Sequence, residues 1–280
     1  MRRTALTLLL GLLPGAGRQS VLVAGLVAGL LTLYNAAPRA QLATPGPSGV
    51  VMGHLHLSTK DVEASRRFWA ALGGVAVQNG QLQLIQLPGT FVMLRQSQQT
   101  TGGTEGSTVD RVVLRVRNSD MDQLAEKLQQ ATGSKVTSAV LTSPEGVAIE
   151  LRVATSQEAA VRMERLVFKT VAPLETRDWY VKTFGASPES LPATPIASLP
   201  GLAMYFTKAE SAPAGTRGRG LDHIGFEVKN LEEFCKKLEA AGQKFDRSYG
   251  RLPNSTTAIA FLTDPWGTYI ELTENLAPPK

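Results

Sequence analysis

Two stretches near the C-terminus decide the fold: residues 221–228, with the sequence LDHIGFEV, and residues 264–272, with the sequence DPWGTYIEL. The first has the composition of a short buried strand, and His223 lies near its start. The second begins with an Asp-Pro-x-Gly turn and continues as a strand that carries Glu271 inside an apolar run. A histidine and a carboxylate on neighbouring strands are the ligands that a divalent metal site requires.

The same pattern occurs four times after residue 51. Each copy begins with a strand, continues with a capped helix and ends with shorter strands; the expected helices are 62–72, 121–131, 174–184 and 231–241. The first strands contain His54, Arg111, Leu166 and His223, and the residues seven positions later are Asp61, Asn118, Pro173 and Asn230. The first and third copies are 112 positions apart, and so are the second and fourth. This spacing predicts the duplication of a two-module unit.

These motifs resemble the vicinal oxygen chelate superfamily, which includes glyoxalase I, bleomycin-resistance proteins and extradiol dioxygenases. The resemblance spans residues 51–275 and rests on four motifs: Phe68-Trp69 before Leu72-Gly73, Asp222-His223-Ile224 with Asn230, Asp264-Pro265-Trp266-Gly267, and Ile270-Glu271-Leu272. It implies an α+β fold in which four βαβββ modules form two glyoxalase-like domains with curled mixed sheets. We expect these domains at residues 51–155 and 164–276, with two modules each.

The N-terminal 50 residues have a different composition. Arg2 and Arg3 precede apolar runs at 5–13 and 21–34, which predicts an export signal or membrane anchor over residues 1–40. Each run is shorter than the roughly 20 residues that span a bilayer. Residues 41–50 contain Pro-Gly-Pro and are expected to form a linker. We therefore expect a periplasmic or secreted protein, either released or anchored in the membrane at its N-terminus.

The resemblance also implies where a metal would bind. In this superfamily paired modules curl into a cup, and ligands project into it from the first and last strands of a module. The usual set is two histidines and one glutamate with open positions for substrate oxygens, which suits one divalent ion of iron, manganese, nickel or zinc. The first-strand positions hold His54, Arg111, Leu166 and His223, and the last-strand positions hold Met93, Glu150, about Met204, and Glu271.

Two ways of pairing the modules remain open at this point. If neighbouring modules pair, one cup has His54 with Arg111 and Glu150, and the other has Leu166 with His223 and Glu271, so neither set is complete. If the first module pairs with the fourth, His54, His223 and Glu271 complete a metal-binding triad. The second and third modules would then form a degenerate cup with Arg111, Glu150 and Leu166.

Three further residues are secondary candidates. His56 shares a strand face with His54, so it could replace that ligand or contact the substrate, although a buried core histidine is an equally ordinary interpretation. Arg111 and Glu150 are expected to form an ion pair across strands, because a glutamate in an apolar run is costly to bury alone. Anion binding by Arg111 is the alternative.

The composition argues against nucleic-acid binding and excludes an intramolecular disulfide. The net charge of +5 comes from scattered basic residues, with no motif or basic stripe for nucleic acid. A single cysteine, Cys235, excludes an intramolecular disulfide. The resemblance to the vicinal oxygen chelate superfamily implies a metal-dependent lyase, isomerase or dioxygenase that acts on a small substrate with vicinal oxygens. The alternative is a metal-free small-molecule binding protein of the bleomycin-resistance type.

Overall fold

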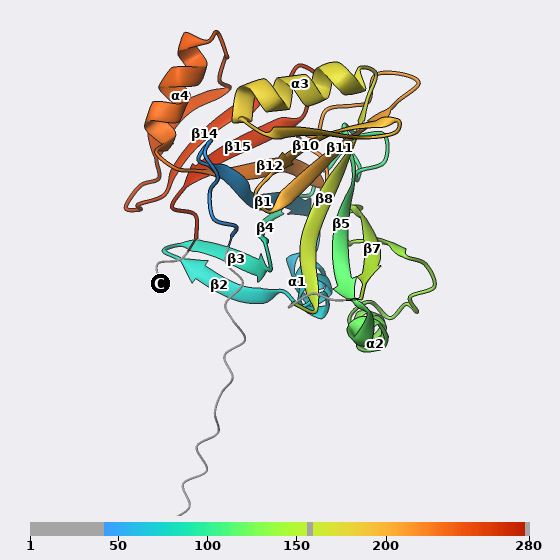
Figure 1. Cartoon of the computed structure of the whole chain (residues 1–280). Coiled ribbons are helices and arrows are strands. Elements are labelled where there is room, and N and C mark those ends of the chain that lie inside the picture. The colour runs from blue at the N-terminus through green and yellow to red at the C-terminus, as the bar shows by residue number, and fades with distance from the viewer. Residues whose placement is uncertain (1–41, 156–158, 278–280) are drawn as a thin grey trace, which may run out of the picture. The chain divides into compact units, whose positions relative to one another are not determined.

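The computed structural model describes residues 42–155 and 159–277 (Figure 1). The predicted export signal or anchor lies outside the described residues. Residues 42–49, in the predicted linker, contain no helix or strand. Within the described part of the chain, no helix is both long enough and apolar enough to cross a membrane.

Four modules follow one another along the chain. The first contains β1 (Val50–Thr59), α1 (Val62–Ala71), β2 (Val75–Asn79), β3 (Leu82–Leu87) and β4 (Thr90–Gln96). The second contains β5 (Val109–Arg117), a 3-10 turn (Asn118–Asp120), α2 (Met121–Thr132), β6 (Val140–Thr142) and β7 (Ala148–Ala154). The third contains β8 (Val161–Thr170), α3 (Pro173–Phe184), β9 (Ser187–Leu191), β10 (Thr194–Leu199) and β11 (Leu202–Lys208). The fourth contains β12 (Leu221–Val228), α4 (Leu231–Ala240), β13 (Arg247–Arg251), β14 (Ala258–Thr263) and β15 (Tyr269–Glu274).

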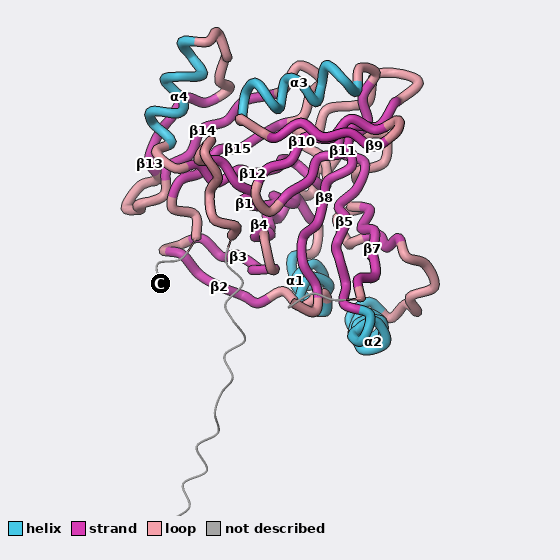
Figure 2. Tube along the Cα trace, in the orientation of Figure 1, coloured by secondary structure: helices cyan, strands magenta, loops and turns pink. Residues whose placement is uncertain are grey.

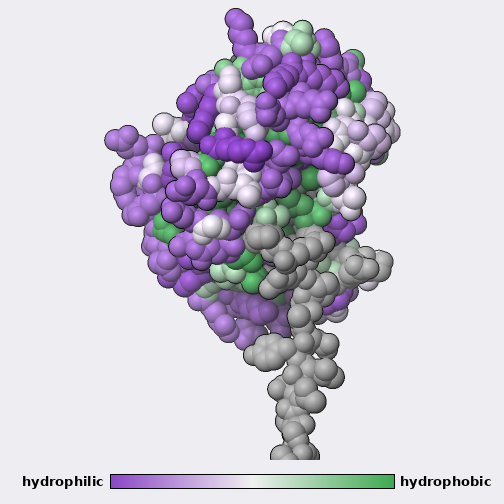
Figure 3. Space-filling model, turned by 90° about the vertical axis from the view of Figure 1, so that its left-hand side faces the viewer, coloured by the Kyte–Doolittle hydropathy of each residue, from purple (hydrophilic) through white to green (hydrophobic). Residues whose placement is uncertain are grey.

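The predicted fold class is confirmed: the protein is α+β, with two mixed sheets and four helices in the described residues. Figure 2 shows the helices at the periphery of the strands. The second module departs from the expected βαβββ pattern, because two strands rather than three follow its helix in the described chain. Figure 3 shows one face of the protein, on which hydrophilic residues predominate and hydrophobic residues appear in patches between them.

The sheets pair the first module with the fourth and the second with the third. The eight-stranded sheet has the order β13-β14-β15-β12-β1-β4-β3-β2, and the seven-stranded sheet has the order β6-β7-β5-β8-β11-β10-β9. Antiparallel pairs β1–β12 and β5–β8 join the modules at the centre of each sheet. Residues 51–155 and 164–276, the two predicted domains, therefore contribute one module each to both sheets.

Alternation along β1 separates the core from the candidate site. Leu55 and Leu57 are fully buried in the main hydrophobic core. Successive side chains of a strand point to opposite faces, so His54 and His56 lie on the other face of the sheet. At the end of this strand Asp61 caps α1, since its carboxylate accepts a hydrogen bond of 2.9 Å from the amide of Ala64.

The third module is one residue out of the register that the sequence spacing predicted. Pro173 is the first residue of α3 rather than its N-cap, a position that proline favours because its missing amide hydrogen is not needed there. Leu166 and Met204 consequently point into the core, where both are fully buried. The strand pairing places Arg165 and Tyr205 at the positions that we had assigned to Leu166 and Met204.

The turn before β15 is anchored by Asp264. One of its carboxylate oxygens accepts hydrogen bonds from the amides of Trp266 and Thr268, at 2.9 and 2.7 Å. The other accepts a hydrogen bond of 3.0 Å from the hydroxyl of Tyr180, which is fully buried in α3. These bonds join the third module to the fourth and hold the start of the strand that carries Glu271.

Glu227 on β12 makes the stability of the fold depend on pH. Burial raises the pKa of its carboxyl from 4.5 to about 7, against hydrogen bonds from the Thr273 hydroxyl and the Leu276 amide. A carboxyl whose pKa is higher in the folded state favours folding below its unfolded pKa, and this contribution is lost as pH rises from 4.5 through 7.

We therefore predict that Glu227→Gln stabilises the protein more at pH 8 than at pH 5. The amide keeps a hydrogen-bonding group in place and removes the charge, so the gain in unfolding free energy relative to wild type should be about 2 kcal/mol larger at pH 8. Urea denaturation of both proteins at the two pH values measures it. An equal difference at pH 5 and pH 8 would contradict the buried, high-pKa carboxyl.

Candidate metal centre

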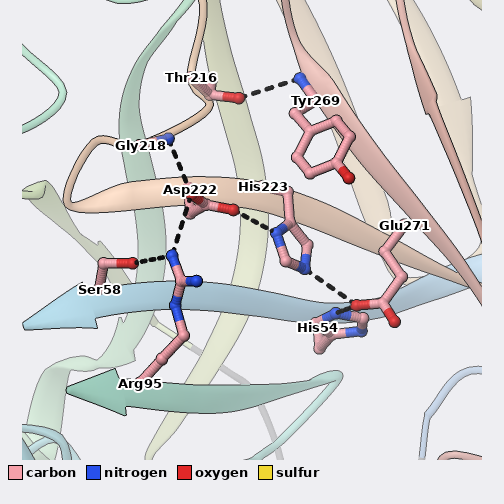
Figure 4. Close-up of polar contacts among 9 residues, drawn as sticks. All are labelled: His54, Ser58, Arg95, Thr216, Gly218, Asp222, His223, Tyr269 and Glu271. Atoms are coloured by element: carbon pink, nitrogen blue, oxygen red, sulfur yellow. Dashed lines mark hydrogen bonds and ion pairs between the residues drawn. The ribbon is translucent and has the colours of Figure 1, made fainter. Parts of the chain in front are cut away.

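Three strands of the eight-stranded sheet bring together His54, His223 and Glu271. β1 and β12 are antiparallel neighbours, and β15 runs parallel to β12 with Glu271 beside Gly225. The Nε2 atoms of His54 and His223 each lie 2.9 Å from the same atom, Oε2 of Glu271 (Figure 4). All three residues are buried, with exposed fractions of 0%, 4% and 7%. This is the triad expected if the first module pairs with the fourth.

A glycine makes room for the first of these ligands. A Cβ at Gly225 would lie 2.0 Å from Cε1 of the His54 ring, much closer than atoms can approach. The imidazole of His54 therefore occupies the space that a side chain on β12 would take. Our sequence reasoning missed this role, although a glycine inside a strand often marks such a close approach.

Asp222 orients the second histidine. Its Oδ1 lies 2.7 Å from Nδ1 of His223, and its Oδ2 accepts hydrogen bonds from the amide of Gly218 at 2.8 Å and from Arg95 at 3.5 Å (Figure 4). Arg95 also donates a hydrogen bond of 3.0 Å to the hydroxyl of Ser58. A carboxylate on the far nitrogen fixes the tautomer of an imidazole, so Nε2 of His223 is directed at Glu271. Asp222 is part of the Asp222-His223-Ile224 motif, but its spacing alone predicted no function for it.

Burial and hydrogen bonding act against each other on the charges of the centre. Burial alone would raise the pKa of Glu271, but hydrogen bonds from His223 and His54 outweigh it and hold that pKa well below its usual range. Burial would likewise lower the pKa of His223, whereas its bonds with Asp222 and Glu271 raise it overall. The centre thus contains an ionised carboxylate, and one imidazole nitrogen each of His54 and His223 faces it.

His56 completes the group. Its ring lies 4.4 Å from the ring of His223, centroid to centroid. Burial, reinforced by the charges of His223 and His54, lowers the pKa of His56 to about 3, so its imidazole is neutral. The four residues His54, His56, His223 and Glu271 each offer one ligand atom, and these atoms all lie within 4.8 Å of one another.

The donor set fits a divalent metal ion. Imidazole nitrogens with a carboxylate oxygen suit transition ions such as zinc, nickel, iron and manganese. Nδ1 of His54 and both nitrogens of His56 are buried and have no hydrogen-bond partner among the described residues. Buried polar atoms are normally paired, and a bound ion is one of the usual partners where no hydrogen-bonding group of the protein is present. In the described part of the chain, this is the one cluster of histidine, cysteine and acidic side chains close enough to hold a metal.

Comparisons with known proteins agree with the fold described above. Residues 170–272 match the sequence model of the Glyoxalase/Bleomycin resistance protein/Dioxygenase superfamily, the vicinal oxygen chelate superfamily. Residues 170–272 therefore carry a domain of this superfamily. Glyoxalase I from Zea mays has a similar fold, with a TM-score of 0.58 and 17% identity over 81% of this chain and 92% of that chain. A putative dioxygenase from Bacillus subtilis gives a TM-score of 0.61 and 14% identity over 81% of this chain and 86% of that chain.

Relatives in this superfamily also match by sequence. The lactoylglutathione lyase of Escherichia coli O157:H7 is 40% identical over 57 residues, and a probable lactoylglutathione lyase of Synechocystis is 40% identical over 55 residues. Each match covers 20% of this chain and 42% of the relative. The chain therefore spans less than half the length of the superfamily relatives that it matches.

The second cup of this superfamily fold has different chemistry. Arg111 and Glu150 lie in the seven-stranded sheet, apart from the triad, and form the expected ion pair at 3.2 Å. Arg165, at the position that corresponds to a histidine of the triad, lies over the ring of Tyr205 at 4.2 Å. Two arginines thus occupy the positions that hold His54 and His223 in the other sheet, and a guanidinium cannot bind a metal cation.

We predict that Gly225→Ala disrupts the candidate centre. The added methyl group overlaps the His54 ring, which must swing away from Glu271, so affinity for a divalent ion should fall at least about tenfold. Titration of the metal-free protein with Co²⁺ measures this affinity. Gly250→Ala is the matched control, since a Cβ at that position on β13 of the same sheet meets nothing within 4 Å. Equal affinities for the two variants would contradict the proposed position of His54.

Proposed function

We propose that this protein is a metal-dependent enzyme, a lyase, isomerase or dioxygenase, acting on a small substrate with two neighbouring oxygen atoms. His54, His223 and Glu271 would hold one divalent ion of iron, manganese, nickel or zinc. The observation that carries the proposal is the convergence of two imidazole Nε2 atoms, each at 2.9 Å, on one buried carboxylate oxygen. The relatives named lactoylglutathione lyase lend support to a lyase.

The protonation states that the contacts of Glu271 would require favour a bound metal. Without one, both histidines must carry a proton on Nε2 to bond the same oxygen. His223 also faces the Asp222 carboxylate through Nδ1, so it would need protons on both nitrogens and a full positive charge. With a metal, each Nε2 presents a lone pair, and the Nδ1 proton of His223 is donated to Asp222. This arrangement satisfies the same contacts without a buried imidazolium.

The chain's own groups have separate tasks in such a reaction. A bound metal would act as a Lewis acid that polarises the substrate oxygens. Asp222 holds the His223 ring in place. The rings of Phe261 and Tyr269 pack edge-on against the same ring, each with its centroid 5.5 Å from that of His223, and this packing limits the motion of the imidazole. Because His56 is neutral, its unprotonated ring nitrogen can accept a hydrogen bond from a ligand that enters the centre.

We also propose that residues 1–40 direct export of the protein. Arg2 and Arg3 ahead of two apolar runs support this assignment. Cell fractionation of the full chain and of a variant that lacks residues 2–40 tests it. Export predicts that only the full chain leaves the cytoplasm, whether or not it stays attached to the membrane. Equal cytoplasmic retention of both would contradict it.

The metal content of the purified protein tests the proposed function. We predict about one divalent ion per chain in wild type, and less than about a tenth of an ion in His223→Ala and Glu271→Gln, because each variant removes one of three ligands. Glu150→Gln is the control, since Glu150 lies in the other sheet and should leave the metal content unchanged. Elemental analysis after dialysis measures all four proteins.

A wild-type metal content near zero that added ions do not restore would overturn the proposal. It would favour instead a metal-free binding protein of the bleomycin-resistance type. In that case a small-molecule ligand should raise the unfolding temperature equally with and without a chelator.

A further inference from the structure

The eight-stranded sheet has an approximate two-fold relation at its centre. In the antiparallel pair of β1 and β12, His54 lies opposite Gly225 and His56 lies opposite His223. Exchanging the two strands therefore exchanges His54 with His223 and His56 with Gly225. β4 and β15 flank this pair in parallel, with Met93 beside His56 and Glu271 beside Gly225. Met93 is thus the counterpart of Glu271.

The two halves of this relation differ in two places. β15 provides the carboxylate of Glu271, whereas β4 provides only the thioether of Met93, which is a soft and weak ligand. Gly225 has no side chain, and the ring of His54 takes its space. Its counterpart His56 carries an imidazole. The half formed by β1 and β4 lacks a carboxylate ligand. It carries instead a second histidine on β1, because His56 lies on the same face of the strand as His54.

No group among the described residues forms a hydrogen bond with the ring nitrogens of His56. Both ring nitrogens are buried and lack a hydrogen-bond partner among the described residues, while the ring itself lies against His223 at 4.4 Å. Burying a polar atom without a hydrogen-bond partner destabilises the folded protein. One ligand atom of His56 lies within 4.8 Å of those of His54, His223 and Glu271, a spacing that allows one ion to bind all four.

We infer that His56 is a fourth protein ligand of the metal and substitutes for the carboxylate that β4 lacks at Met93. This inference rests on the proposed function and goes beyond its three-residue site. The ion would be held by three imidazoles and one carboxylate. Such a nitrogen-rich set favours zinc, nickel or cobalt over manganese, and it leaves fewer positions for substrate oxygens than a triad does.

Spectroscopy of the Co²⁺ and Cu²⁺ forms tests the inference without an activity assay. We expect His56→Phe to keep one metal site per chain but to bind Co²⁺ about 10- to 100-fold more weakly and to change its visible spectrum. Pulsed electron paramagnetic resonance of the Cu²⁺ form should count three imidazoles in wild type and two in the variant. Met93→Leu is the control and should alter neither affinity nor spectrum.

Stability measurements separate loss of a ligand from damage to the fold. Phenylalanine replaces two unpaired nitrogens with an apolar ring, so metal-free His56→Phe should be at least as stable as metal-free wild type, and the added metal should stabilise it less. Unchanged affinity, spectrum and imidazole count in His56→Phe, with metal lost in His223→Ala, would overturn the inference and leave the proposed function intact. Absence of metal from wild type would overturn both.

Discussion

The antiparallel pairing of β1 with β12 is the interaction on which the candidate centre depends. β1 carries His54 and His56, and β12 carries His223, on the face opposite the core. A single register therefore decides both the packing of the sheet and the contact of His54 with Glu271. A slip by one residue would turn Leu55 toward the centre and His54 into the core, since side chains alternate along a strand. The hydrophobic core therefore enforces the geometry of the site.

The cost of burying charge is the second constraint. Glu271 is a carboxylate in a nearly dry environment, and it is tolerable there because two imidazoles face it. The carboxylate of Asp222 is also buried, and it is balanced by hydrogen bonds with His223, with the Gly218 amide and with Arg95 near the surface. In the seven-stranded sheet the same positions hold Arg111 and Arg165, and Glu150 is balanced by a guanidinium rather than by imidazoles. The two sheets thus carry a candidate metal centre in one case and an ion pair in the other.

Local sequence patterns were sufficient to predict the four repeated modules and their helices, and the resemblance to the superfamily indicated His54, His223 and Glu271 as a triad under one of two module pairings. The Asp61 cap, the glycine stops and the spacing of His54 and His223 are local signals that physical rules interpret directly. The choice of module pairing was not accessible, because both pairings bury similar strands and only long-range contacts distinguish them. The slip at Leu166 arose because Pro173 was equated with capping residues, although proline begins helices. Gly225 was missed because the ring that fills its space belongs to a residue far away in sequence.

The central claim is that distant modules assemble one metal site from His54, His223 and Glu271. Its most direct test is a crystal structure of the metal-loaded protein, with anomalous diffraction recorded at the absorption edge of the bound metal. The account predicts a single strong anomalous peak within bonding distance of Nε2 of His54, Nε2 of His223 and the carboxylate of Glu271. Absence of a peak there, or a peak at Glu150 in the other sheet, would contradict it.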